Sequence, residues 1–327
     1  MKRPLEWERV NAVSPNAALQ SDVFRLYLLV VGALLATAGG VLGVLTWGLR
    51  KNVQQVWVTY RGWLIMAPAV MGCILVGREA TLFGWTLLAI FGMKEFARAT
   101  GLYTDWWMTG TVYLAIAAIS VATLMADPFT GHPGWFGLFM SLPVFVVATI
   151  LLLPILRNRT QGQLQTISLA IVGFLYIGWM FGHLAFLANS NHPYGYLLYV
   201  ILAVELSDVA AFTSGKLFGR HQLRSQISPN KTWEGALGAL AVSMALPWIL
   251  GFSFPHFGPV QRVLTGLIVG VGGQLGDLSI SVIKRDLGIK DMGAVIPGHG
   301  GILDRIDSLI YLAPLFLHMV DYFYGLR

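Results

Sequence analysis

The chain has 327 residues, of which 56% are hydrophobic and only 12% charged, with a formal net charge of +6 and a mean hydropathy of +0.66. Apolar stretches recur along almost its whole length, which excludes an ordinary water-soluble domain and predicts an all-α, polytopic integral membrane protein. The single cysteine, Cys73, excludes an internal disulfide and a cysteine metal cage. The first 22 residues carry charges and a proline where a signal peptide needs an apolar core, so we expect a retained surface tail.

The apolar stretches predict about ten transmembrane helices, since a helix needs ~20 residues to cross a bilayer. The second stretch is short and contains Pro68, so it could be re-entrant or form one irregular unit with the third, and nine helices is the alternative. The stretches lie at 26–49, 63–77, 80–97, 106–125, 135–156, 166–188, 194–213, 233–252, 260–283 and 305–324.

The distribution of lysine and arginine predicts an orientation. With ten helices, fifteen of these residues fall in or beside one set of loops and only Arg78 and Arg262 in the other. The positive-inside rule makes the richer set cytosolic, including the loops 214–232 and 284–304. The basic N-terminal tail would then lie outside, a conflict that nine helices would remove.

The two halves of the chain differ in their polar residues. We expect residues 1–190 to form a lipid-facing scaffold of helices and residues 191–327 to form the catalytic region. Lys94, Glu95 and Arg98 have helical spacing and are interpreted as interfacial, with stems reaching the headgroups. His183 stands on an apolar helix and is interpreted as a packing residue rather than a ligand.

The C-terminal region begins with two carboxylates on one helix face. Glu205 and Asp208 are three residues apart, so both must point into a polar cavity or be neutralised. The following SPNKT stretch, 228–232, precedes a helix that Thr232 could cap, leaving backbone amides that could bind an anion. This is a phosphate-site hypothesis, although a plain junction between a loop and a helix would look similar.

A second polar face follows on a glycine-rich helix. Glycines at 266, 270, 272, 273 and 276 predict close packing against neighbouring helices. Asp277, Ser281 and Lys284 then project from one face over two turns, or ~10 Å.

Two further carboxylates, Asp304 and Asp307, open the last helix, where the helix dipole favours negative charge. Together with Asp277 and the surrounding cations they suit phosphoryl chemistry, in which carboxylates bind Mg²⁺ and cations bind phosphate oxygens. Cysteine and histidine ligands lack the spacing that zinc requires.

The run SVIKRDLGIKDMGAVIPGHGGILDRID, from Ser281 to Asp307, resembles the signature of the phosphatidate cytidylyltransferases, also called CDP-diacylglycerol synthases. GKLFG at 215–219, SPNKTWEG at 228–235 and GDL at 276–278 are similar to further blocks of that family, in the same order. Where the family typically has an Ala-Asp-Thr-type block, residues 205–211 read ELSDVAA, which keeps an acid at Asp208.

The resemblance implies transfer of the cytidylyl group of CTP to phosphatidate, which gives CDP-diacylglycerol and pyrophosphate. It implies Mg²⁺ on Asp277 and Asp304, with a second cation left open. The further catalytic residues expected are Lys284, Arg285 and Asp208. Substrate contacts are expected from Ser228, Asn230, Lys231, Thr232, Ser281, Lys290, His299, Gly300, Gly301, Arg305 and Asp307.

The expected partners are CTP, phosphatidate and membrane lipid, with no nucleic acid; a homodimer is left open. A bacterial plasma membrane with a cytosolic active site is the expected location. Three alternatives remain: a CTP-dependent kinase of polyprenols, an ion-coupled transporter using Asp277 and Glu205, and a paralogue with altered lipid or weakened activity because of its changed 205–211 block. Transporters tend to contain internal repeats, and none is visible here.

Overall fold

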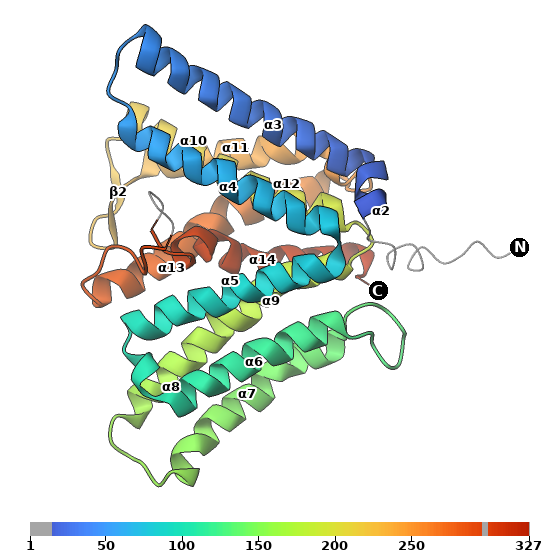
Figure 1. Ribbon diagram of the computed structural model, residues 1–327, viewed down its shortest axis with the longest axis vertical. Helices are drawn as coiled ribbons and strands as arrows, with labels where there is room; N and C mark the ends of the chain where they lie inside the picture. Colours follow the sequence, from blue (N-terminus) through green and yellow to red (C-terminus); the bar gives the residue numbers. More distant parts are fainter. Residues whose placement is uncertain (1–14, 296–299, 327) are drawn as a thin grey trace, which may run out of the picture.

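The computed structural model describes residues 15–295 and 300–326. Within these ranges ten long helical segments run back and forth through one bundle, and eight of them are long and apolar enough to cross a membrane (Figure 1). The prediction of an all-α polytopic membrane protein is therefore confirmed. The segments are α3 with η1 (Asp22–Gly43, Val44–Gly48), α4 (Gln54–Val76), α5 (Arg78–Ala99), α6 (Trp106–Leu124), α7 (Phe136–Leu156), the continuous α8, η3, α9 and η4 (Gln163–Val172, Gly173–Met180, Phe181–Phe186, Leu187–Asn189), α10 (Pro193–Phe218), α11 (Trp233–Ile249), the continuous α12, η6 and α13 (Pro259–Leu267, Ile268–Gly272, Gly273–Asp286) and α14 (Leu303–Tyr324).

The second helix is longer than the apolar stretch predicted. α4 begins at Gln54 and continues through Pro68 to Val76, so it is not re-entrant. Gly77 follows with a φ of 137°, a conformation that favours glycine, and it separates α4 from α5. Because the number of segments is even, the first and the last begin and finish at the same end of the bundle. The short helix α2 (Pro15–Gln20) and the C-terminal end of α14 both lie at the end opposite the β-hairpin (Figure 1).

The two charged loops lie at the same end of the bundle, as predicted, but both are shorter than expected (Figure 1). α10 continues to Phe218, so the first loop starts at 219, and it contains the antiparallel strands β1 (Gln222–Arg224) and β2 (Ser228–Thr232). α13 continues to Asp286 and α14 starts at Leu303, so the second loop is the 287–302 loop, of which the structure describes 287–295 and 300–302. The last turns of both helices contact neighbouring segments, Gly215 of α10 packing against Thr232 and Arg285 of α13 bonding to the carbonyl of Ile227.

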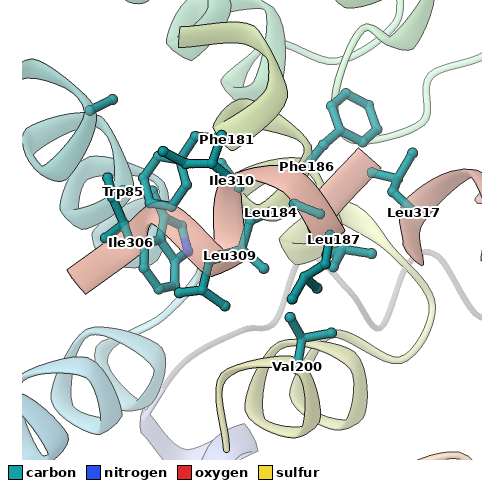
Figure 2. Packing of buried hydrophobic residues seen from close by; sticks show 14 of the residues in the cluster. Trp85, Phe181, Leu184, Phe186, Leu187, Val200, Ile306, Leu309, Ile310 and Leu317 are labelled. Atoms are coloured by element: carbon teal, nitrogen blue, oxygen red, sulfur yellow. The ribbon is translucent and has the colours of Figure 1, made fainter. Parts of the chain in front are cut away.

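The helix α14 lies at the centre of the bundle. Its apolar residues are buried on several sides, as expected of a helix surrounded by others. Figure 2 shows this packing, in which Trp85 of α5 and Phe181 of α9 lie near Ile306, with their rings 5.8 Å apart. Val200 of α10 belongs to the same apolar cluster and lies near Leu187. Helix α14 as a whole is thus packed by helices from both halves of the chain, including α5, α9, α10 and α13.

The predicted close packing of the glycine-rich helix is also confirmed. A Cβ at Gly266 or Gly270 would lie 2.8 Å from Met244 Cα or 3.1 Å from Leu240 Cα on α11. A Cβ at Gly276 would lie 2.9 Å from Ser308 Cα on α14. Because these positions lack side chains, the backbones of α13 and α14 approach closely beside Asp277. The π-helical segment η6 lies directly before α13. Short π-helical segments occur frequently at functional sites.

His183 is completely buried, as its interpretation as a packing residue requires. Its Nδ1 lies 2.8 Å from the carbonyl oxygen of Trp179, one turn earlier on the same helical segment. The imidazole also packs edge-on against Phe139, with ring centroids 4.8 Å apart. These contacts are those of a residue that fills space between helices.

Candidate active site

A polar cavity of about 120 Å³ opens where α10, α13, the 287–302 loop and α14 meet. Of the described residues, six carboxylates and two basic side chains line it, in a protein whose residues are only 12% charged. Such a concentration of charge in a helical membrane protein is typical of a functional site. The lining residues are Glu205, Asp208, Asp277, Lys284, Asp291, Asp304, Arg305 and Asp307.

Helical spacing brings these residues together. On α10, Glu205 and Asp208 are one turn apart and face the same side. On α13, Asp277 and Lys284 are two turns apart and both face the cavity. The sequence predicted that Asp277 and the acids at the start of α14 face one cavity, and the structure places them there. It also places Glu205 and Asp208 of α10 in the same cavity.

Asp277 joins α13 to the β-hairpin. Its Oδ1 accepts a hydrogen bond of 3.2 Å from Ser281 Oγ, and its Oδ2 lies 2.5 Å from Lys231 Nζ of β2. Both members of the ion pair are partly exposed, at 33% for Asp277 and 28% for Lys231, so solvent weakens the attraction between them. The pair is therefore able to open when another charged group enters.

Asp304 both faces the cavity and holds the loop. Its Oδ1 accepts a hydrogen bond of 2.8 Å from Lys284 Nζ. Its Oδ2 accepts backbone N–H groups from Met292 at 2.9 Å and Gly301 at 3.0 Å. The preceding turn uses a positive φ of 80° at Gly300, where glycine is favoured. Charge-assisted bonds to a buried carboxylate are strong, so this loop is anchored at its C-terminal end.

The other carboxylates have fewer partners. Asp307 accepts a hydrogen bond of 2.7 Å from the N–H of Ser308 through Oδ1. In the part of the chain that the structure describes, Glu205 and Asp208 have no ion pair within 4.0 Å, although both line the cavity. Carboxylates that line one cavity repel one another, and additional cations relieve that repulsion. The cavity is therefore suited to bind positive charge.

The donor atoms fit a hard divalent cation such as Mg²⁺. They are carboxylate oxygens, and among the residues that the structure describes neither cysteine nor histidine lines the cavity. Among the described residues no three such side chains converge closely enough to hold a metal ion as they stand. The ammonium groups of Lys231 and Lys284 instead occupy Asp277 and Asp304. A bound cation would compete with those lysines for the same oxygens.

Arg285 lies outside the cavity. Its exposed guanidinium donates hydrogen bonds to two backbone carbonyls, those of Ile227 in the hairpin and Ile289 in the loop, each at 3.1 Å. It therefore holds the hairpin beside the 287–302 loop. Lys290 is exposed on the same loop and does not line the cavity. His299 falls outside the described residues.

Part of the phosphate-site hypothesis is wrong. Thr232 does cap α11, because its Oγ1 accepts the N–H of Gly235 at 3.1 Å. The N–H of Trp233 donates to the carbonyl of His221 at 2.9 Å. These two amides are therefore not free to bind an anion. Of the residues predicted on β2, Ser228, Asn230 and Thr232 stay on the hairpin, while only Lys231 reaches a cavity carboxylate.

The interfacial interpretation of Glu95 is also wrong. Its side chain is buried, with 8% exposure, and its two oxygens accept the N–H groups of Ile302 at 3.0 Å and Leu303 at 2.9 Å. Sequence reasoning missed this contact because its partners lie 207 and 208 residues away. The available signal was a carboxylate within the apolar stretch 80–97. Asp291 was likewise not predicted to line the cavity.

The fold and the cavity together define an integral membrane protein whose charged site lies at one end of a helical bundle. A comparison with protein families matches residues 57–323 to the cytidylyltransferase family. The chain therefore belongs to the cytidylyltransferase family. Membership of this family makes it a nucleotidyltransferase.

Individual relatives agree with this assignment. A phosphatidate cytidylyltransferase of Staphylococcus haemolyticus (strain JCSC1435) is 31% identical over 253 residues, covering 77% of this chain and 92% of the relative. A phosphatidate cytidylyltransferase of Staphylococcus aureus (strain COL) is 34% identical over 202 residues, covering 61% and 76%. The uncharacterized protein YnbB of Escherichia coli (strain K12) is 30% identical over 296 residues, covering 89% and 96%.

Proposed function

We propose that this protein transfers the cytidylyl group of CTP to phosphatidate, forming CDP-diacylglycerol and pyrophosphate. The observation that carries the proposal is the meeting of Asp277 and Asp304 in one cavity, each paired with a lysine. The staphylococcal relatives named phosphatidate cytidylyltransferase support the choice of lipid substrate. Apolar helices around a polar cavity suit a reaction between a lipid headgroup and a soluble nucleotide.

In the proposed reaction, a phosphate oxygen of phosphatidate attacks the α-phosphorus of CTP. A new P–O bond forms, the bond between the α-phosphorus and its bridging oxygen breaks, and pyrophosphate leaves with the electron pair. The nucleophile is already an anion, so it needs little activation by a base. Positioning and neutralisation of charge would therefore supply most of the rate enhancement.

The basic residues would neutralise phosphate charge at different positions in the site. Lys284 and Arg305 line the cavity and would neutralise phosphate oxygens there. Lys231, on the hairpin, would exchange its bond to Asp277 for one to the triphosphate. Asp277 and Asp304 would hold Mg²⁺, which supplies additional neutralisation of phosphate charge when bound. The remaining acids, Glu205, Asp208 and Asp307, leave room for a second cation.

The bundle's orientation follows from the positions of its charges. The cavity end carries Arg50, Lys51, Arg157 and Arg159 on the connections between helices. The positive-inside rule would place this end in the cytosol, where CTP is available. We expect the membrane to be a bacterial plasma membrane, in keeping with the bacterial relatives.

The deciding experiment follows two labels with the purified protein in detergent, supplied with phosphatidate, Mg²⁺ and CTP. Label on the α-phosphate should enter the lipid, and label on the γ-phosphate should appear in pyrophosphate. Transfer of the γ-label to a lipid hydroxyl would instead indicate a CTP-dependent lipid kinase. If neither label reaches phosphatidate or polyprenol, another acidic lipid should be tested, and phosphatidate is rejected as the substrate.

A substitution at Lys231 tests the role of the hairpin. Lys231→Met should reduce kcat/KM for CTP by about 10- to 100-fold, mainly through KM, because one charge-assisted contact to the triphosphate is lost. Lys216→Met is the matched control, since Lys216 is exposed at the end of α10 and lies over the ring of Phe212. Steady-state kinetics with varied CTP give the answer, and an unchanged KM would contradict the assigned role.

A further inference from the structure

The loop 287–302 is held by two buried carboxylates that come from different helices. Asp304 accepts the amides of Met292 and Gly301. Glu95, on α5, accepts the next two amides, those of Ile302 and Leu303. Two carboxylates thus accept four backbone N–H groups in and beside this loop. Asp304 lines the cavity, whereas Glu95 of α5 is not among the lining residues.

The contact at Glu95 replaces an ordinary helix cap. The residue at the N-cap position of α14 is Ile302, which has no side chain able to accept a hydrogen bond. The first amides of a helix require acceptors, and they favour negative charge. Glu95 meets both needs from a separate helix, so the position of α14's first turn depends on α5.

Two glycines make this approach possible. A Cβ at Gly301 would lie 2.5 Å from Glu95 Oε2, and a Cβ at Gly293 would collide with Glu95 Oε1. Gly293 and Gly301 also approach each other, since the Gly301 Cβ would lie 2.8 Å from Gly293 N. The carboxylate is therefore enclosed by backbone from two places in the chain, Gly293 on one side and Gly301 to Leu303 on the other.

We propose that Glu95 is a positioning residue, which fixes the first turn of α14 so that Asp304 faces Lys284 in the cavity. This inference rests on the proposed cytidylyl transfer for its effect on rate. Glu95 does not line the cavity, so it acts through the backbone of Ile302 and Leu303 rather than on the substrates. Its loss should slow the reaction without weakening the binding of CTP.

The test compares Glu95→Gln with Glu79→Gln, which makes the same chemical change on the same helix at an exposed site. Glutamine keeps the size but has one acceptor oxygen and an amide that donates, so one backbone N–H loses its partner. Glu95→Gln should lower kcat by about 10- to 100-fold and leave KM for CTP within about twofold. Glu79→Gln should change neither.

Amide hydrogen exchange, measured without substrates, provides the second readout. Glu95→Gln should speed exchange at Ile302 and Leu303 by about tenfold or more, because opening this turn becomes easier. Exchange in the β-hairpin and the melting temperature should stay unchanged. Unchanged exchange at these two amides would overturn the inference, as would a loss confined to KM or a general fall in melting temperature.

A second variant keeps the inference testable if Glu95→Gln does not fold. Gly293→Ala leaves Glu95 intact but places a methyl group against its Oε1, and it should produce the same faster exchange and lower kcat. Exchange does not depend on any reaction, so the two proposals fail separately. A wild type that makes no labelled lipid rejects the proposed function, whereas an unaltered first turn of α14 in both variants rejects the role of Glu95.

Discussion

Replacing Asp304 with asparagine should reduce cytidylyl transfer by at least ~100-fold, equivalent to about 2.7 kcal/mol of transition-state stabilisation. The carboxylate has two tasks that asparagine cannot perform together. Oδ1 accepts Lys284 Nζ, and Oδ2 accepts two backbone N–H groups. An asparagine keeps only one acceptor oxygen, so its NH₂ group would face either the ammonium or the two amides.

Label from α-labelled CTP in the lipid product measures this loss. Asp286→Asn is the matched control, because Asp286 is an exposed carboxylate at the end of α13 and does not line the cavity. It should retain nearly full activity. Asp304→Asn should also weaken the protection of the Met292 and Gly301 amides from hydrogen exchange. Retention of more than about a tenth of the wild-type rate would show that Asp304 is not essential to the transfer.

Helical periodicity predicted part of the cavity lining. Asp277 and Lys284 recur on one face of α13 and both line the cavity, whereas Ser281 on that face bonds to Asp277 and is not among the lining residues. A three-residue spacing likewise places Asp304 and Asp307 on neighbouring positions of α14. Such patterns depend only on the geometry of a single helix, so they can be recognised in the sequence without knowing which helices pack against it. The long charged run Ser281–Asp307 also indicated that the site lies in the C-terminal part of the chain.

The contacts between distant segments could not be predicted in the same way. Nothing near Glu95 in the sequence indicates that its partners are the amides of Ile302 and Leu303, because that contact depends on how α5 packs against α14. The interpretation of its charge as interfacial followed the usual behaviour of such residues. The same limit applies to Lys231, whose ion pair with Asp277 depends on how the hairpin folds over α13.

Loop boundaries were wrong for a related reason. Hydropathy marks where apolar residues end, whereas α10 continues through Lys216 to Phe218 and α13 continues through Lys284 to Asp286. A small residue lets the last turn of α10 pack closely, since a Cβ at Gly215 would lie 3.1 Å from Thr232 Oγ1. The last turn of α13 is held by a different contact, the 2.8 Å bond from Lys284 Nζ to Asp304 Oδ1. Contacts of these kinds stabilise helical turns that lie beyond the apolar segment.

Replacing Gly276 with alanine should separate the two helices that carry the site. A methyl group at this position would collide with the carbonyl oxygen of Asp307 and lie 2.9 Å from Ser308 Cα, both of them backbone atoms of α14. Backbone cannot rotate away as a side chain can, so α13 and α14 must move apart. Overpacking in a tight core costs about 1–3 kcal/mol, and here it also displaces Asp277 from Asp304.

Gly273→Ala is the control, because its methyl group would meet only Ser308 Cβ, at 3.9 Å. Both substitutions gain helix propensity of about 1 kcal/mol, so Gly273→Ala should keep or raise the melting temperature. Gly276→Ala should lower it and reduce cytidylyl transfer by about tenfold or more. A variant at Gly276 that is as stable and active as the one at Gly273 would show that the spacing of α13 and α14 tolerates a side chain, and that the cavity does not depend on their close contact.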